Sequence, residues 1–156
     1  YNDTIKELKM YKCKFILILF LISFPFFSYS NEGATGIVNE RMDKFQESKN
    51  LMRTINKSLS DNNFDIIKQS AEKLNKWAIE MHKYFPKGSE ANSSNKSQAS
   101  DNIWSDPEEF KKAVKKFEIT SAKLIKISQN KNIDETVSSF RELAASCKGC
   151  HKQFRN

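Results

Sequence analysis

The sequence predicts an all-α protein that folds as an antiparallel four-helix bundle. Four segments carry apolar residues at intervals of three and four positions, as amphipathic helices do. Short polar turns separate the first two segments and the last two, and a longer loop lies between the pairs, which suits a bundle with one crossover connection. No stretch of the 156 residues alternates apolar and polar side chains as a half-buried strand would.

The beginning of the chain has the pattern of a secretory signal peptide. A basic segment, Lys12 to Lys14, precedes an apolar run from Phe15 to Phe27, and the small residues of Ser28-Tyr29-Ser30 suit a cleavage site. The run is shorter than the roughly 20 residues of a membrane-spanning helix and contains Pro25. An uncleaved anchor is the alternative to a cleaved signal peptide.

Cleavage would remove residues 1–30 and leave residues 31–156 as one domain. Met10 is the expected initiator, which places residues 1–9 upstream of the true start. Cleavage also removes Cys13, so only two cysteines would remain and no disulfide framework is expected. These features predict an exported, periplasmic protein.

The first pair of helices is predicted between residues 34 and 85. The first helix runs from Ala34 to about Leu59, and its apolar stripe consists of Val38, Met42, Phe45, Met52 and Ile55. The second follows a polar turn at residues 60–63 and ends where Pro86 and Gly88 interrupt it. Its stripe consists of Phe64, Ile67, Ala71, Leu74, Ala78, Met81 and Phe85. Residues 87–102 are polar and predict an exposed crossover loop.

The second pair of helices follows this loop. Asp106 and Pro107 predict the start of the third helix, which extends to about Ser128. Its apolar stripe consists of Phe110, Val114, Phe117, Leu124 and Ile127. After a turn at residues 130–132, Asp134 is the expected cap of the fourth helix. The stripe of that helix consists of Val137, Phe140, Ala144, Cys147, His151 and Phe154.

The run Cys147-Lys148-Gly149-Cys150-His151 is the attachment signature of c-type haem. On a helix these two thiols and the imidazole share one face, so all three can reach one flat ligand. Cys147 and Cys150 would form thioethers with one covalent haem c, and His151 would be the axial iron ligand. Because the motif continues the apolar stripe, the haem is expected inside the bundle.

A redox dithiol and a zinc site are the alternatives for this motif. A redox dithiol usually accompanies a βαβ pattern, which this sequence lacks. A zinc site needs four ligands, and His82 is the only other His or Cys after residues 1–30. His82 lies off the apolar stripe of its helix, so we expect it to be exposed rather than a second iron ligand.

The net charge of +7 does not by itself decide between classes of binding partner. The basic residues are spread along helices that also carry acidic residues, which favours a solvated surface, although an acidic redox partner protein could use them. No basic stripe is interleaved with aromatics, so we expect no nucleic-acid binding. No nucleophile–base pair or carboxylate pair stands out, so we expect no enzyme activity. Trp77 and Trp104 are expected to be packing residues.

Further residues resemble the class II c-type cytochromes, the cytochrome c′ family, in which the haem motif lies in the last helix. The resemblance covers residues 37–155 and implies a four-helix bundle with one covalent haem c. The residues that carry it, besides the motif itself, are Phe154 and Arg155 after it, Tyr84-Phe85-Pro86-Lys87-Gly88-Ser89, Ile103-Trp104, Val38 and Arg41. The sequence departs from the family at Asp101, where relatives often have proline, and in a longer preceding loop.

In this family, the residue four positions after Arg41 lies over the distal face of the haem. Methionine there gives six-coordinate iron and electron transfer, whereas an apolar residue leaves the iron five-coordinate. Here the residue is Phe45, so the resemblance implies a vacant sixth position guarded by a phenyl ring. Met42 shares the same helical face and is the alternative sixth ligand, or else a packing residue.

Two arginines complete the expected site. The resemblance places Arg41 near the haem propionates; a surface arginine paired with an acidic residue is the alternative. Arg155 lies one turn beyond His151, where it could cover the proximal face or tune the imidazole, or fray at the C-terminus.

The sequence supports three functional hypotheses. The first is a five-coordinate haem protein that handles electrons and small gases such as nitric oxide and carbon monoxide. The second is a six-coordinate electron carrier that uses Met42. The third, of another class, is a haem-free bundle with Cys147 and Cys150 as a redox or metal pair. The resemblance is also compatible with a homodimer and with redox partner proteins.

Overall fold

The computed structural model describes residues 36–156. The expected signal peptide, the initiator Met10 and the expected helix start at Ala34 lie outside the described residues. Within the part that is described, no helix is long and apolar enough to cross a membrane.

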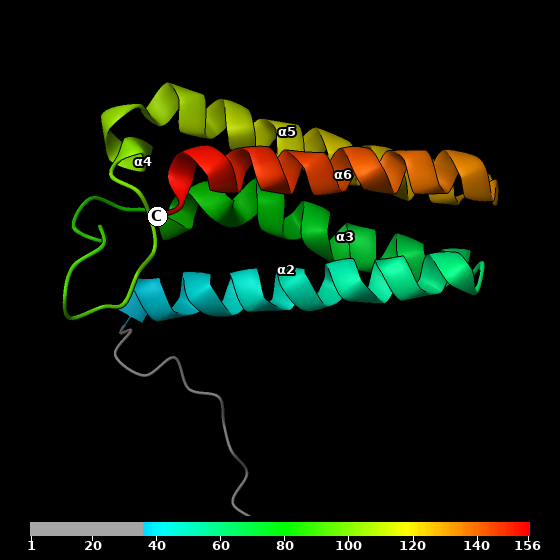
Figure 1. Ribbon diagram of the computed structural model, residues 1–156, viewed down its shortest axis with the longest axis horizontal. Helices are drawn as coiled ribbons and strands as arrows, with labels where there is room; N and C mark the ends of the chain where they lie inside the picture. The colour runs from blue at the N-terminus through cyan, green and yellow to red at the C-terminus, as the bar shows by residue number, and fades with distance from the viewer. Residues whose placement is uncertain (1–35) are drawn as a thin grey trace, which may run out of the picture. The chain divides into compact units, whose positions relative to one another are not determined.

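Four long helices confirm the predicted bundle (Figure 1). A 3₁₀ turn extends the second long helix, and a one-turn helix precedes the third. In chain order, the elements are α2 (Gly36–Ser60), α3 (Phe64–Glu80), η2 (Met81–Tyr84), α4 (Asn102–Ser105), α5 (Pro107–Ser128) and α6 (Ile133–Phe154).

Side-chain caps begin three of the helices. The side chain of Asn63 accepts a hydrogen bond from the N–H of Ile66 at the start of α3. Asp106 accepts from the N–H of Glu109 at the start of α5, as predicted, and Pro107 is the first residue of that helix. The prediction for α6 was wrong: Asn132 is its cap and accepts from the N–H of Glu135. Asp134 lies inside the first turn instead.

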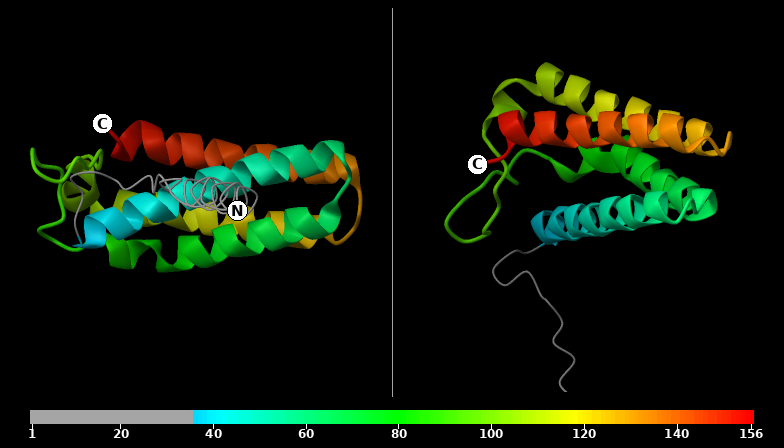
Figure 2. Two further views of the ribbon diagram at one scale, coloured as in Figure 1. Left: turned by 90° about the horizontal axis from the view of Figure 1, so that it is seen from below. Right: turned by 45° about the vertical axis from the view of Figure 1, so that its right-hand side comes forward.

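The helices do not pack equally closely. α3 packs on α2 and on α5, and α5 packs on α6, whereas α2 contacts α6 at few positions. Figures 1 and 2 show that α2 and α6 diverge toward the end of the bundle that carries the crossover loop and the C-terminus. The core is therefore continuous through α3 and α5, and it includes Ile67, Leu74 and Leu124, all fully buried.

The buried face of α6 differs from the predicted stripe. Its buried side chains are Thr136, Ser139, Leu143, Ser146 and Phe154. Small hydroxyl side chains fill the contact with α5, where Thr120 Oγ1 donates to Ser146 Oγ over 3.1 Å. Most of the predicted stripe, from Val137 to His151, lies beside this face and is half-buried or exposed. Thr136 and Ser146 can be buried here because their hydroxyls donate to carbonyls of their own helix, those of Asn132 and Leu143.

The crossover loop, expected to be exposed, is anchored at several points. Ser89, Asn95 and Ala99 are buried. The loop also pairs with the end of the chain: the N–H of Ser100 donates to the carbonyl of Phe154 over 3.0 Å, and the N–H of Asn156 donates to the carbonyl of Gln98 over 2.9 Å. The loop is therefore fixed against the C-terminal end of α6.

The cap of α6 can be tested by mutation. Asn132→Ala should lower the free energy of unfolding by about 1 kcal/mol, because the N–H of Glu135 loses its acceptor. Asp134→Ala should cost less, since it removes only a charge near the helix N-terminus. Denaturant unfolding of both variants measures this. If Asp134→Ala costs as much as Asn132→Ala, the assignment of the cap is wrong.

Candidate haem site

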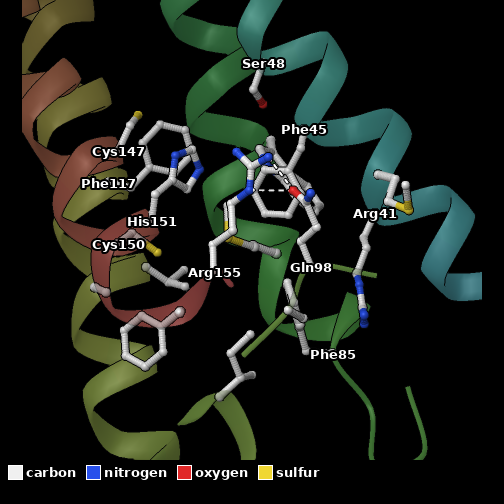
Figure 3. Close-up of a pocket in the computed structure, with 18 of the residues that line it drawn as sticks. Arg41, Phe45, Ser48, Phe85, Gln98, Phe117, Cys147, Cys150, His151 and Arg155 are labelled. Carbon is white, nitrogen blue, oxygen red and sulfur yellow. Dashed lines mark hydrogen bonds between the residues drawn. The ribbon is translucent and has the colours of Figure 1, made fainter. Parts of the chain in front are cut away.

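A cavity of about 570 Å³ opens where α2 and α6 diverge. Side chains from α2, α3, α5 and α6 and from the crossover loop line it, and the lining is mostly apolar. This volume lies within the roughly 300–1,000 Å³ of sites that enclose small molecules and cofactors. Figure 3 shows the motif residues on α6 across the cavity from α2.

The three motif residues line one wall of the cavity. Cys147 and Cys150 are half-buried free thiols, and His151 is exposed. They share one face of α6, next to the face that packs on α5. The structure therefore brings together the groups that the sequence predicted to meet a single ligand.

Both thiols are protonated at neutral pH, and burial extends the protonated state to higher pH. Burial raises the pKa of Cys147 above its ordinary value of 9.0. It also raises the pKa of Cys150, to about 11, with a smaller contribution from the neighbouring Cys147. Although His151 is solvent-accessible, partial desolvation at the cavity wall lowers its pKa, and the charge of Arg155 lowers it further. At neutral pH the imidazole is therefore uncharged, which is the form that binds a metal.

The residues of the cavity fit a c-type haem. Two thiols and a neutral imidazole converge on one wall, and apolar side chains such as Val114, Phe117 and Phe154 suit a porphyrin face. The lining includes four basic residues and no acidic one, which suits the two carboxylates of a haem. A zinc site fits poorly, because within residues 36–156 the cavity lining adds no fourth His, Cys, Asp or Glu to the three motif residues.

Phe45 faces His151 across the cavity. The phenyl and imidazole ring centroids are 6.3 Å apart, with the planes inclined by 70°. The phenyl ring also packs edge-to-face on Trp77 and on Phe85, with ring centroids 5.6 Å and 6.4 Å apart, respectively. Met42 lines the same cavity and is half-buried, so both candidates for the distal position are present.

Arg41 is buried, with 2% of its surface exposed, and it holds the crossover loop. Nη1 donates to Ser89 Oγ over 2.8 Å and to the Tyr84 carbonyl over 3.3 Å. Nη2 donates to the Ser89 carbonyl over 2.6 Å and to Ser97 Oγ over 2.7 Å. The guanidinium also stacks over the Phe85 ring, 4.7 Å from its centroid.

These contacts overturn one interpretation of Arg41. It is not a surface arginine paired with an acidic side chain, because its partners are carbonyls and hydroxyls. Burial lowers its pKa, and the charge of Glu90 offsets part of this effect. Arg41 lines the cavity, so its expected place near haem propionates stays a prediction.

Arg155 also lines the cavity, where it bonds to the crossover loop. Its Nε donates to Gln98 Oε1 over 2.8 Å, and its Nη2 donates to the same oxygen. Its backbone N–H donates to the carbonyl of His151. Arg155 therefore does not fray, and its charge acts on the neighbouring imidazole.

Sequence reasoning missed part of the lining. Lys49 and Lys96 contribute to the basic rim together with the two arginines. Lys49 lies one helical turn after Phe45, so its place could have been inferred, whereas Lys96 is placed by the loop. Trp77 lines the cavity in addition to packing. His82 is exposed and does not line the cavity, as expected.

The hydrogen bonds by which Arg41 holds the crossover loop can be tested separately from haem binding. Arg41→Lys should lower the free energy of unfolding by about 2–3 kcal/mol. An ammonium cannot replace the planar guanidinium, which donates to Tyr84, Ser89 and Ser97 at once. Arg53→Lys on the exposed face of α2 is the matched control, with an expected change within about 0.5 kcal/mol. If denaturant unfolding shows equal losses of free energy in the two variants, Arg41 does not hold the loop in this way.

The raised thiol pKa values predict how the haem-free protein reacts. A thiol reacts with an alkylating reagent as the thiolate, so the folded protein should be modified slowly at pH 8 and faster as the pH rises toward 11. The unfolded protein in denaturant, with ordinary thiol pKa values, should react faster at pH 8. Mass spectrometry measures both rates, and equal rates at pH 8 would contradict the burial of the thiols.

Comparison with known proteins supports the same assignment. The family model described as "Cytochrome C'" matches residues 36–155. Among curated proteins, none matches this chain. Cytochrome c′ from Thermochromatium tepidum is 20% identical, with a TM-score of 0.71, and the match covers 76% of this chain and 93% of that one.

Two further solved structures have the same fold. Cytochrome c′ from Rubrivivax gelatinosus is 19% identical, with a TM-score of 0.68 and coverage of 77% and 94%. A ferrous variant from Alcaligenes xylosoxidans with bound NO is 22% identical, with a TM-score of 0.68 and coverage of 77% and 93%. The bundle, the cavity with its haem motif and the family match over nearly the whole described chain lead to one conclusion: this chain belongs to the cytochrome c′ family, whose members carry one covalently attached haem c.

Proposed function

We propose that this protein is an exported c-type haem protein with five-coordinate iron, which binds small gases and transfers electrons. The observation that carries the proposal is the pairing of His151 with Phe45 across the cavity, because one ring can ligate iron and the other cannot. A bound haem supplies an iron that exchanges electrons and accepts small axial ligands. The side chains of this chain attach the haem, ligate the iron and control access to it.

Cys147 and Cys150 attach the haem in the proposed site. Each thiol adds across one vinyl group, so that a carbon–sulfur bond forms and the S–H hydrogen goes to the other vinyl carbon. No oxidant or reductant is needed, and both cysteines must be reduced, as free thiols are. The addition fixes the porphyrin to α6, and the neutral imidazole of His151 supplies the axial nitrogen.

Phe45 guards the other face. Its ring packs against Trp77 and Phe85, so a ligand that reaches the sixth position has to displace it. This steric barrier favours diatomic gases over bulkier ligands. Solved relatives from Alcaligenes xylosoxidans are described with bound nitric oxide and with bound carbon monoxide, which supports gases as ligands of this chain.

The basic rim supports a role in electron transfer. Lys49, Lys96 and Arg155 are exposed and line the cavity, which has no acidic residue in its lining, so this surface attracts an acidic partner. We propose an acidic redox partner protein in the periplasm, where cleavage after residue 30 would leave the bundle. A homodimer is part of the proposal as well, since one solved relative is described as having ligand-controlled dimer dissociation.

The six-coordinate alternative rests on Met42, which lines the same cavity one turn before Phe45. Absorption spectra of the oxidised holoprotein distinguish the two. The proposal predicts a predominantly high-spin spectrum, because no side chain occupies the sixth position. A low-spin spectrum that turns high-spin in Met42→Leu would establish the alternative and contradict the proposal.

A substitution at Phe45 provides a second test. Phe45→Met should convert the high-spin spectrum toward low spin, because a thioether then stands opposite His151. Phe64→Met is the control, since Phe64 is half-buried at the start of α3 and does not line the cavity. Its spectrum should equal that of the wild type. If Phe45→Met leaves the spin state unchanged, Phe45 does not stand over the sixth position.

A further inference from the structure

Trp77 carries a buried hydrogen-bond donor that has no acceptor. Only 5% of its surface is exposed, and it lines the haem cavity. Among the buried side-chain polar atoms in residues 36–156, only Trp77 Nε1 and Ser139 Oγ lack a hydrogen-bond partner. Most buried donors in proteins are paired, so an unpaired indole N–H beside a binding cavity calls for an explanation.

The other indole of the chain shows the usual arrangement. Trp104 Nε1 donates to the carbonyl of Phe85 over 3.2 Å and to that of Pro86 over 3.3 Å. Trp104 does not line the cavity. The unpaired indole is therefore the one that borders the cavity, and the paired one is the one that does not.

The neighbours of Trp77 suggest when its N–H is used. The indole packs edge-to-face against Phe45 and against Tyr84, with ring centroids 5.6 Å and 5.0 Å apart, respectively. Phe45 is the ring that faces His151, so it is the side chain that an incoming ligand displaces in the proposed function. When Phe45 moves, one of the two aromatic rings that pack on the indole is gone. The ligand that displaced Phe45 can then approach the indole N–H.

We propose that Trp77 Nε1 is the hydrogen-bond donor of the distal pocket, and that it donates to the outer atom of a diatomic ligand once Phe45 has swung aside. This inference rests on the proposed function, because it requires a vacant face beneath Phe45. The donor would strengthen binding of diatomic ligands whose outer atom accepts a hydrogen bond. An otherwise apolar pocket would thereby gain chemical selectivity in addition to its steric selectivity.

The test uses carbon monoxide bound to the reduced holoprotein. A hydrogen bond to the oxygen of carbon monoxide lowers the C–O stretching frequency, so Trp77→Phe should raise it relative to the wild type. Carbon monoxide should also dissociate about three- to tenfold faster from Trp77→Phe, which corresponds to one ordinary hydrogen bond. Trp104→Phe removes an indole that does not itself line the cavity and whose N–H is already paired, so it should leave the frequency unchanged.

A measurement on the wild type keeps the inference testable if Trp77→Phe does not fold. Exchange of the indole N–H for N–D in heavy water should shift the C–O stretching frequency of the wild-type complex. An unchanged frequency in heavy water, or equal frequencies in the wild type and Trp77→Phe, would overturn the inference. The second of these results is also expected if the indole N–H binds a haem carboxylate instead.

Failure of the inference differs from failure of the proposed function. A six-coordinate, low-spin spectrum that carbon monoxide does not change would refute the vacant face itself, and Trp77 with it. A high-spin spectrum that responds to carbon monoxide, with a frequency independent of Trp77, would refute the role of Trp77 alone.

Discussion

The rotation of α6 about its own axis decides where the haem motif lies. One face, from Thr136 to Ser146, has small hydroxyl side chains and packs on α5. That packing fixes the rotation of the helix, and the adjacent face with Cys147, Cys150 and His151 then lines the cavity. If the predicted apolar stripe were itself packed on α5, the thiols and the imidazole would be covered. The haem motif is accessible because a different face carries the packing.

A second set of contacts positions the opposite wall. Arg41 bonds to Ser89 and Ser97 in the crossover loop, and Gln98 of the same loop bonds to Arg155 at the end of α6. The loop therefore connects the start of α2 to the end of α6 at the end of the bundle where these helices diverge (Figures 1 and 2). The same contacts fix the positions of Arg41 and Arg155, two of the four basic residues that line the apolar cavity.

Local patterns predicted most of the fold, and contacts distant in the sequence account for the rest. The haem motif, the end of α5 at Ser128 and the cap at Asp106 follow from residues within a few positions of one another. The wrong cap at Asp134 shows that adjacent polar residues compete for the same role. The loop anchors could not be predicted, because Arg41 meets partners 43 to 56 positions away. The buried face of α6 was missed because most of its side chains are small and polar, and their burial follows from the packing of α6 on α5.

A porphyrin bonded to α6 in the cavity between α2 and α6 can be detected from the mass of the denatured protein, after expression in cells that mature c-type cytochromes, followed by peptide mapping. We expect a polypeptide that starts after residue 30 and carries one haem, located on the peptide with Cys147 and Cys150. A denatured protein with two free thiols and no added mass would contradict this expectation.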